Sequence, residues 1–104
     1  MAVFFDTYAS AASAAVAPAV AGKIVRIHRV VFTTATNGKL VLLQDPGGGS
    51  EAKITPDLQG RGGGSPVDLP FSREFPAAAR GLSVGLTTDI ADAHGVWIEY
   101  EYVD

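Results

Sequence analysis

The sequence contains no cysteine among its 104 residues. Disulfide bonds and cysteine-based zinc sites are therefore excluded, and the composition indicates no particular redox compartment. Charged residues are also scarce, at 18% of the chain, where a soluble domain usually has about 25%. Because so little charge is available to cover the surface, we expect some apolar area to contact another chain. A compact monomer rich in alanine and glycine is the alternative.

Long apolar runs are absent as well, since no stretch reaches the roughly 18 residues of a membrane-spanning helix. The first ten residues, MAVFFDTYAS, contain an acidic residue and no basic one, which argues against a secretory signal. The net charge is −3 and the eight basic residues are scattered, whereas nucleic-acid binders carry basic patches. Lys23, Arg26 and Arg29 lie close together, but a solvated strand edge is favoured there over phosphate contacts. We therefore expect neither nucleic acid nor a membrane as a partner.

Short segments rich in β-branched and aromatic residues, separated by turn residues, predict an all-β fold. We expect one small antiparallel β-sandwich or jelly-roll-like domain, with strands at 23–32, 39–44, 51–55, 67–71, 80–87 and 95–103. Asn37-Gly38 is a strong hairpin signal, which predicts that the first two of these strands pair around it. The broken alternation at 29–32 predicts a bulge or a strand buried on both faces. Irregular segments are expected at 45–50, 60–65, 75–79 and 89–94.

Alternation along the later strands predicts which side chains share a face. In 80–87, the inward residues are Leu82, Val84 and Leu86, while Gly81 and Gly85 indicate close approach of another backbone or a ring. Two prolines confine 67–71 to a sheet edge. The last strand divides into one face with Val96, Ile98, Tyr100 and Tyr102, and another with Trp97, Glu99, Glu101 and Val103.

The first 21 residues differ in composition from the rest, with an apolar start around Val3 and an alanine-rich continuation. Alanine favours a helix, but Pro18 and Gly22 would end one. Two interpretations compete: a short helix or extended arm packed on a neighbouring subunit, and a first strand followed by a loose Ala/Ser linker. We favour an extended arm or edge strand over 1–21, followed by a single β-sandwich domain over 22–104.

The sequence contains no recognisable catalytic or ligand-binding pattern. His28 and His94 have no partner at the spacing of a known metal motif, and a polar turn accounts for the acidic residues of 89–94 better than a metal site does. The glycine runs match no phosphate-binding loop and are expected to be flexible loop tips. Glu99 and Glu101 share one strand face, whereas glycosidase carboxylates flank a substrate from different elements. We therefore expect no catalytic, cofactor or metal site, and a protein that is not an enzyme.

Trp97 is the most informative single side chain, because alternation places it on a strand face with two glutamates. Tryptophan is enriched where proteins contact one another. An inter-subunit contact is favoured for Trp97, while a core position and a stacking site for a sugar or small ligand remain open. Together with the apolar N-terminal residues, this gives a predicted interface made of Val3, Phe4, Phe5, Tyr8 and Trp97.

Several segments recur in an order found in one group of viral proteins. They are the G-K-hydrophobic-x-hydrophobic strand from Gly22, a glycine-rich loop, the Leu-Pro-Phe segment at 69–71, the Gly-Leu-Ser-Val stretch at 81–84 and the aromatic last strand. Over residues 22–103 the chain resembles small β-sandwich virion proteins of tailed bacteriophages or phage-like particles, of the capsid-decoration or head-spike-base type. The resemblance transfers no functional residue.

This resemblance implies a non-enzymatic, homo-oligomeric structural subunit that decorates a capsid or forms a spike or neck component. Its expected partners are other virion proteins such as the major capsid protein, and its expected location is the virion, assembled in the bacterial cytoplasm. The alternative is a carbohydrate-binding β-sandwich module for host-surface attachment, with Trp97, Tyr100 and Tyr102 as aromatic faces. Alternation places Trp97 opposite the two tyrosines, which counts against a single glycan-binding platform.

Overall fold

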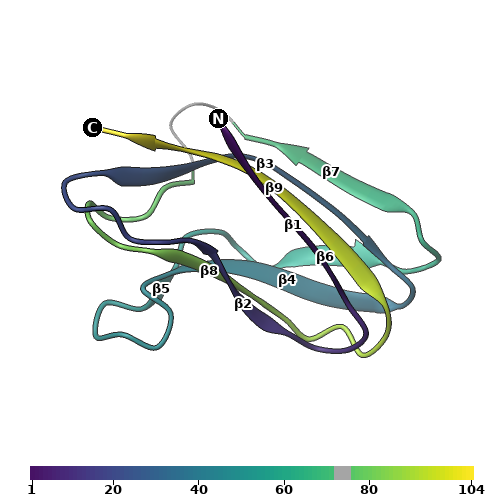
Figure 1. Ribbon diagram of the computed structural model, residues 1–104. Helices are drawn as coiled ribbons and strands as arrows, with labels where there is room; N and C mark the ends of the chain where they lie inside the picture. The colour runs from purple at the N-terminus through teal and green to yellow at the C-terminus, as the bar shows by residue number, and fades with distance from the viewer. Residues whose placement is uncertain (72–75) are drawn as a thin grey trace.

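The computed structural model describes residues 1–71 and 76–104, and in these residues it contains nine β-strands and no helix. The strands form two antiparallel sheets packed face to face, as Figure 1 shows in its upper and lower layers. The predicted all-β sandwich is therefore confirmed. No helix in the described ranges is long and apolar enough to cross a membrane.

The first sheet has four strands in the order β1-β9-β3-β7. The second sheet has the order β2-β8-β4-β5, and β6 also pairs with β4. The bounds in chain order are β1 Ala2–Tyr8, β2 Ser13–Ala17, β3 Ile24–Thr34, β4 Asn37–Gln44, β5 Ala52–Lys53, β6 Leu58–Arg61, β7 Pro66–Pro70, β8 Val84–Thr88 and β9 His94–Val103.

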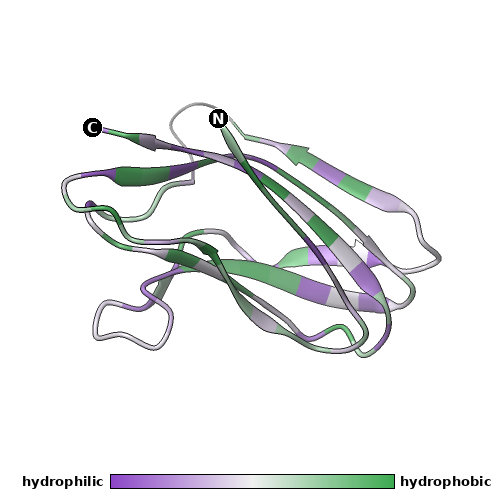
Figure 2. Ribbon diagram, viewed as in Figure 1, coloured by the Kyte–Doolittle hydropathy of each residue, from purple (hydrophilic) through white to green (hydrophobic). Residues whose placement is uncertain are grey.

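The core lies between the two sheets and consists of alternate residues from strands of both layers. Figure 2 shows the hydrophobic segments along these strands in green. Burial of one such side chain contributes roughly 1.5–3 kcal/mol, so a small sandwich depends on many of them. The largest buried apolar side chains are Phe32, Ile27, Leu40, Leu42, Leu86, Ile90, Ile98, Val25, Val30, Val84 and Val96.

The predicted hairpin at Asn37-Gly38 is wrong. Consecutive strands β3 and β4 lie in different sheets, and residues 35–36 cross between them. Asn37 and Gly38 belong to β4, where they pair with Arg61 and Gly60 of β6. The expected hairpin turn needs positive φ at both central residues, and neither residue has it. In addition, β3 has no free edge for β4, because β9 and β7 pair with its two sides.

The glycine run of the predicted loop 60–65 is held against this crossing and is not a free loop tip. Gly62, Gly63 and Gly64 all have positive φ, which glycine adopts without steric cost. The backbone N–H groups of Gly63 and Gly64 donate to the carbonyl oxygens of Ala35 and Thr34, and that of Gly62 donates to Thr34 Oγ1 at 2.9 Å. This segment therefore satisfies backbone acceptors where the chain changes sheets.

The first 17 residues contribute one edge strand to each sheet. β1 pairs with β9 at the edge of the first sheet, and β2 pairs with β8 at the edge of the second. β1 is therefore an edge strand, and the loose Ala/Ser linker is wrong for Ser13–Ala17, which form β2. Small side chains suit β2, because Ala17 is fully buried and Ala14 packs against the core.

Close approach of another backbone or a ring was predicted at both Gly81 and Gly85, and the structure shows it at Gly85 alone of the two. A Cβ added at Gly85 would lie 2.6 Å from Pro46 Cγ and 2.9 Å from the carbonyl oxygen of Ala14. Close approach of a backbone and a ring is therefore confirmed at Gly85. The prediction is wrong at Gly81, which lies in a turn before β8, has a φ of 81° and would meet nothing within 4 Å.

Other boundaries shift by a few residues. The predicted bulge is confirmed in β3, where the register with β9 shifts between Ile27 and Arg29. The predicted strand at 51–55 shortens to β5, and that at 80–87 begins only at Val84. The strand at 67–71 is confirmed as β7, an edge of the first sheet. Within the predicted connector, residue 75 lies outside the described residues, and Ala77 forms an isolated bridge with Arg26.

Candidate functional site

The outer face of the first sheet, which points away from the core, carries the predicted interface tryptophan. The register places Phe5 of β1 beside Trp97 of β9, Trp97 beside Val31 of β3, and Val31 beside Asp68 of β7. Two residues before Phe5 on β1, and on the same face, Val3 lies beside Glu99 of β9. We call Val3, Phe5, Val31 and Trp97 the apolar row.

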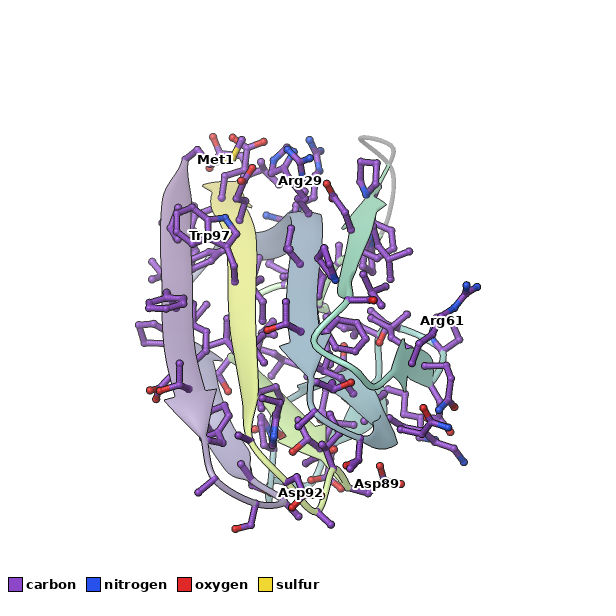
Figure 3. The ribbon with its side chains drawn as sticks, turned by 90° about the vertical axis from the view of Figure 1, so that its right-hand side faces the viewer. Met1, Arg29, Arg61, Asp89, Asp92 and Trp97 are labelled. Atoms are coloured by element: carbon purple, nitrogen blue, oxygen red, sulfur yellow. The ribbon has the colours of Figure 1, made fainter. Side chains whose placement is uncertain are left out.

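Three of the four side chains in the apolar row are exposed, and Val31 is half-buried. Phe5 is 63% exposed, Val3 48% and Trp97 40%. The rings of Phe5 and Trp97 lie with centroids 6.1 Å apart and planes inclined by 56°. Figure 3 shows Trp97 beside the ribbons of β1 and β9 at the end of the sheet near Met1. Adjacent exposed apolar side chains of this size on a sheet face indicate a contact with another molecule.

A shallow, open hollow adjoins the apolar row. It is lined by residues that include Phe5, Trp97, Thr7, Thr33 and Gly95. Gly95 has no side chain, and a Cβ there would lie 3.6 Å from both Thr33 Oγ1 and Thr7 Cγ2. The missing side chain in the middle strand therefore creates a depression between two threonines and the aromatic pair, which a protruding apolar group can fill.

A charged network covers the remaining part of the same face. Glu101 Oε1 lies 2.7 Å from His28 Nε2 and 3.5 Å from Arg26 Nη1. Arg29 donates to both carboxylate oxygens of Asp68, at 2.8 and 2.6 Å. Lys23, the third member of the predicted basic group, pairs with Asp104. Lys23, Arg26 and Arg29 therefore neutralise carboxylates within the protein. The predicted strand edge is wrong here, because β9 and β7 pair with the two sides of β3.

Three side chains on the first sheet have shifted pKa values. The guanidinium of Arg29 lowers the pKa of Asp68 through a direct hydrogen bond, and the carboxylate in turn raises the pKa of Arg29. At the other end of β1, burial raises the pKa of Tyr8, and the nearby charge of Asp6 raises it further.

The carboxylates of Glu99 and Glu101 on the outer face both have partners within the protein. Trp97 Nε1 donates to Glu99 Oε2 at 3.0 Å, which fixes the indole against the sheet. Glu101 is bonded to two basic side chains from β3. The two glutamates on one strand face, noted in the sequence, therefore hold side chains in position and define the border of the apolar row.

The polar groups of the turn before β9, and of His94 at the start of β9, form hydrogen bonds within the protein. His94 is buried, with Nε2 2.9 Å from Thr88 Oγ1 and Nδ1 2.8 Å from the carbonyl oxygen of Asp92. The carbonyl oxygen only accepts, so Nδ1 donates to it, and in the neutral ring Nε2 then accepts from the Thr88 hydroxyl. Thr88 Oγ1 also accepts the N–H of Ala12 at 3.0 Å. Asp89 Oδ1 accepts the N–H of Lys39 at 2.6 Å. Among the residues that the structure describes, no group of three His, Cys, Asp or Glu could hold a metal ion.

The structure divides the five predicted interface residues into two sets. Val3, Phe5 and Trp97 lie together on the outer face, whereas Phe4 and Tyr8 point to the inner side and pack partly buried against the core. A core position for Trp97 is wrong, since its side chain is exposed.

Sequence reasoning missed Val31 and Gly95, which complete the surface. Val31 can be placed beside Trp97 only when the register after the β3 bulge is known. Gly95 could have been found from the sequence, because it lies two residues before Trp97 and therefore on the same strand face. A side chain at this position would fill the hollow.

Comparisons with known proteins add little to this description. No family model matches the chain, and no curated protein matches it. The structure of the infectious bursal disease virus Gx strain is similar over 99% of this chain, at 11% sequence identity and a TM-score of 0.35. The chain spans 37% of the length of that viral protein. A likeness at this level does not establish a shared family.

Proposed function

We propose that this chain is a non-enzymatic structural subunit of a virion, of phage or phage-like type, held in the particle by protein contacts. The observation that carries the proposal is the apolar row, which places Phe5 and Trp97 side by side and exposed on a sheet face. Tryptophan and other aromatic side chains dominate the binding energy of many protein interfaces. Adjacent exposed aromatic side chains of this kind mark a surface that contacts another protein.

The assignment to a phage or phage-like virion rests on the sequence as well as on the apolar row. The pattern of segments over 22–103 resembles decorating, spike or neck proteins of tailed phages, which contact the major capsid protein and other virion proteins. The rigid sandwich presents the row on three paired strands, β1, β9 and β3, so that a partner meets a surface of fixed shape. We propose assembly in the bacterial cytoplasm and a final location in the virion, with no cofactor.

A carbohydrate-binding module is the second candidate, and the geometry supports it less well. Tyr100 and Tyr102 form an edge-to-face pair with centroids 6.0 Å apart and pack against the core. They lie on the face of β9 opposite to Trp97, so the three aromatic rings cannot form one glycan platform. Specific hits for the native chain on a glycan array, lost in Trp97→Ala, would favour this candidate over the structural role.

The test is co-sedimentation of the purified chain with particles from the same source. Trp97→Asp places a charge in the apolar row, and Val20→Asp is its matched control, because Val20 is also 40% exposed but lies outside the row. We expect Trp97→Asp to weaken binding by about thirtyfold or more, as for the loss of an interface hot spot, and Val20→Asp to bind like the native chain. Equal binding by both variants, or a native chain that stays in the supernatant at every ratio, would contradict the proposal.

A further inference from the structure

β1 is an edge strand whose outer side is open to pairing. It forms the outermost strand at the left of Figure 3, and among the described residues no strand pairs with its free side. Its seven residues, AVFFDTY, pair with β9 without a register shift and include no proline, lysine or arginine. A long, regular and apolar edge of this kind is a template for a further strand.

The other sheet edges carry features that block such pairing. β7 begins at Pro66 and ends at Pro70, which cannot donate backbone hydrogen bonds. β2 has five residues and a register shift between Ala15 and Ala17. On the remaining edge, β5 has two residues and β6 four, and each includes a basic residue. Short, bulged, charged and proline-containing edges are those that natural proteins use to prevent sheet extension. Of these features β1 has only one, the single carboxylate of Asp6.

The hydrogen-bond ladder shows which residues of β1 direct their backbone outward. The N–H of Ala35 donates to the carbonyl oxygen of Ala93, so the odd-numbered residues of β9 face β3 in this part of the ladder. The even-numbered residues of β9 therefore face β1 and bond to its even-numbered residues. It follows that Val3, Phe5 and Thr7 direct their N–H and C=O groups to the open edge. The N–H of Thr7 agrees with this, since it donates to the side chain of Asp6 at 2.8 Å.

We infer that β1 pairs antiparallel with β1 of a second copy of this chain, about a two-fold axis at Phe5. This register places Phe5 opposite the second copy's Phe5 and Val3 opposite its Thr7. All seven residues then have a partner, and the three outward residues of each strand exchange about six backbone hydrogen bonds. The result is one continuous sheet in the order β7-β3-β9-β1-β1-β9-β3-β7.

The placement of charge and apolar side chains supports this occupant and this register. Asp6 is the one charged side chain of β1. With the axis at Phe5, Asp6 faces Phe4 of the second copy, whereas an axis at Asp6 would bring two carboxylates together. With the axis at Phe5, three pairs of residues with outward N–H and C=O groups face each other across the two β1 strands. With the axis at Phe4 or Asp6, only two such pairs do. The two-fold axis is perpendicular to the sheet, so the outer faces of the two copies lie on the same side. The two apolar rows therefore join into one surface.

A cysteine pair tests the register directly, since the native chain has no cysteine. Phe5→Cys brings two Cα atoms to about 5.5 Å across the axis, within the range of a disulfide. The matched control is Val3→Cys, on the same face of the same strand, whose Cα lies about 14 Å from its counterpart. We expect mild oxidation to cross-link Phe5→Cys into a covalent dimer and to leave Val3→Cys unlinked. Equal cross-linking of both variants, or of neither, overturns the inference.

A proline substitution tests the backbone pairing. Phe5→Pro and Phe5→Ala both remove the ring, but only Phe5→Pro removes the outward N–H, and an edge strand tolerates this. We expect the dimer dissociation constant of Phe5→Pro to exceed that of Phe5→Ala by about tenfold in analytical ultracentrifugation, because two hydrogen bonds are lost at the axis. Circular dichroism and thermal unfolding of both variants check that the sandwich remains folded. Equal dissociation constants for the two variants would contradict edge pairing.

The biological purpose of the dimer rests on the proposed structural role, but different experiments test the dimer and the role. A native chain that is monomeric over a wide concentration range and still co-sediments with particles overturns the dimer and leaves the proposed function standing. A dimer with the predicted cross-link that never binds particles overturns the function and leaves the dimer. Pairing of β1 with a strand of another particle protein would appear as particle binding that Phe5→Pro weakens more than Phe5→Ala, without a covalent dimer of Phe5→Cys, and this result also overturns the second copy as the partner of β1.

Discussion

The ring of Phe5 on β1 lies 6.1 Å from the ring of Trp97 on β9, and both side chains are exposed on the outer face of the first sheet. The two residues are 92 positions apart in the chain and meet because β1 and β9 pair antiparallel. Trp97 is the single tryptophan of the protein, so its fluorescence reports on this surface alone.

We expect Trp97→Ala to change the free energy of unfolding by less than about 1 kcal/mol, because the side chain is exposed. Acrylamide quenching of the native tryptophan should be efficient in the free protein and reduced after assembly. A loss of about 3 kcal/mol or more on truncation, as for a buried aromatic residue, would show that Trp97 supports the core.

Gly85 should be intolerant of a side chain. Gly85→Ala places a methyl group against the carbonyl oxygen of Ala14 and the ring of Pro46, and overpacking of this kind costs roughly 1–3 kcal/mol. Gly49→Ala is the control, because nothing lies within 4 Å of a Cβ there. Urea unfolding of the two variants measures the difference, and an equally small effect at both positions would disprove the close packing of β2 on β8.

The hydroxyl of Thr88 should contribute to stability through two partners. Thr88→Val keeps the shape of the side chain but leaves the N–H of Ala12 and Nε2 of His94 without their partner. We expect a cost of roughly 1–3 kcal/mol, as for buried polar groups that lose a hydrogen bond. Thr87→Val, at the neighbouring half-buried position of β8, is the matched control and should be close to neutral. A melting temperature equal to that of the native protein in Thr88→Val would contradict the hydrogen-bond chain.

The ion pair between Arg29 and Asp68 should be visible as a shifted titration. Arg29 lowers the pKa of Asp68 below its ordinary value of 3.8. We expect Arg29→Gln to raise the pKa of Asp68 toward that value in an NMR titration, while Arg26→Gln, which removes the partner of Glu101 instead, leaves it unchanged.

The sign of the associated pH dependence follows from the direction of this shift. A depressed pKa in the folded state means that the pair stabilises the protein above the unfolded-state pKa, near 3.8. This contribution is lost as the pH falls through the lower, folded-state pKa of Asp68. Both side chains are exposed, so the effect on unfolding is small. An identical acid limb for the native protein and Arg29→Gln, together with an unshifted Asp68, would show that the pair does not form in solution.

Alternation along single strands was predictable from the sequence because the pleat of a strand fixes it locally. The shared face of Val96 and Ile98 on β9, and the position of Trp97 on the opposite face, follow from a period of two residues. The close approach at Gly85 was predictable for a similar reason, since a glycine within a strand leaves room for another chain segment.

Strand pairing was not predictable in the same way, because it depends on contacts between distant segments. Asn37-Gly38 has the composition of a hairpin turn, yet both edges of β3 are taken by β9 and β7. The chain therefore crosses to the second sheet, and Gly38 serves there as a strand residue whose Cβ would lie 2.5 Å from Ile90 Cγ1. Tertiary packing thus overrode a strong local signal.

The sequence by itself determined an all-β chain of two-faced strands, with Trp97 on the face of its strand opposite Ile98, since side-chain alternation and turn composition are local properties. Only the tertiary structure decided that β1 lies beside β9, that Val3 and Phe5 therefore join Trp97 and Val31, and that Phe4 and Tyr8 turn to the core. The physical reason is that a shared surface depends on register between strands far apart in the chain, and register is set by the packing of the whole sandwich.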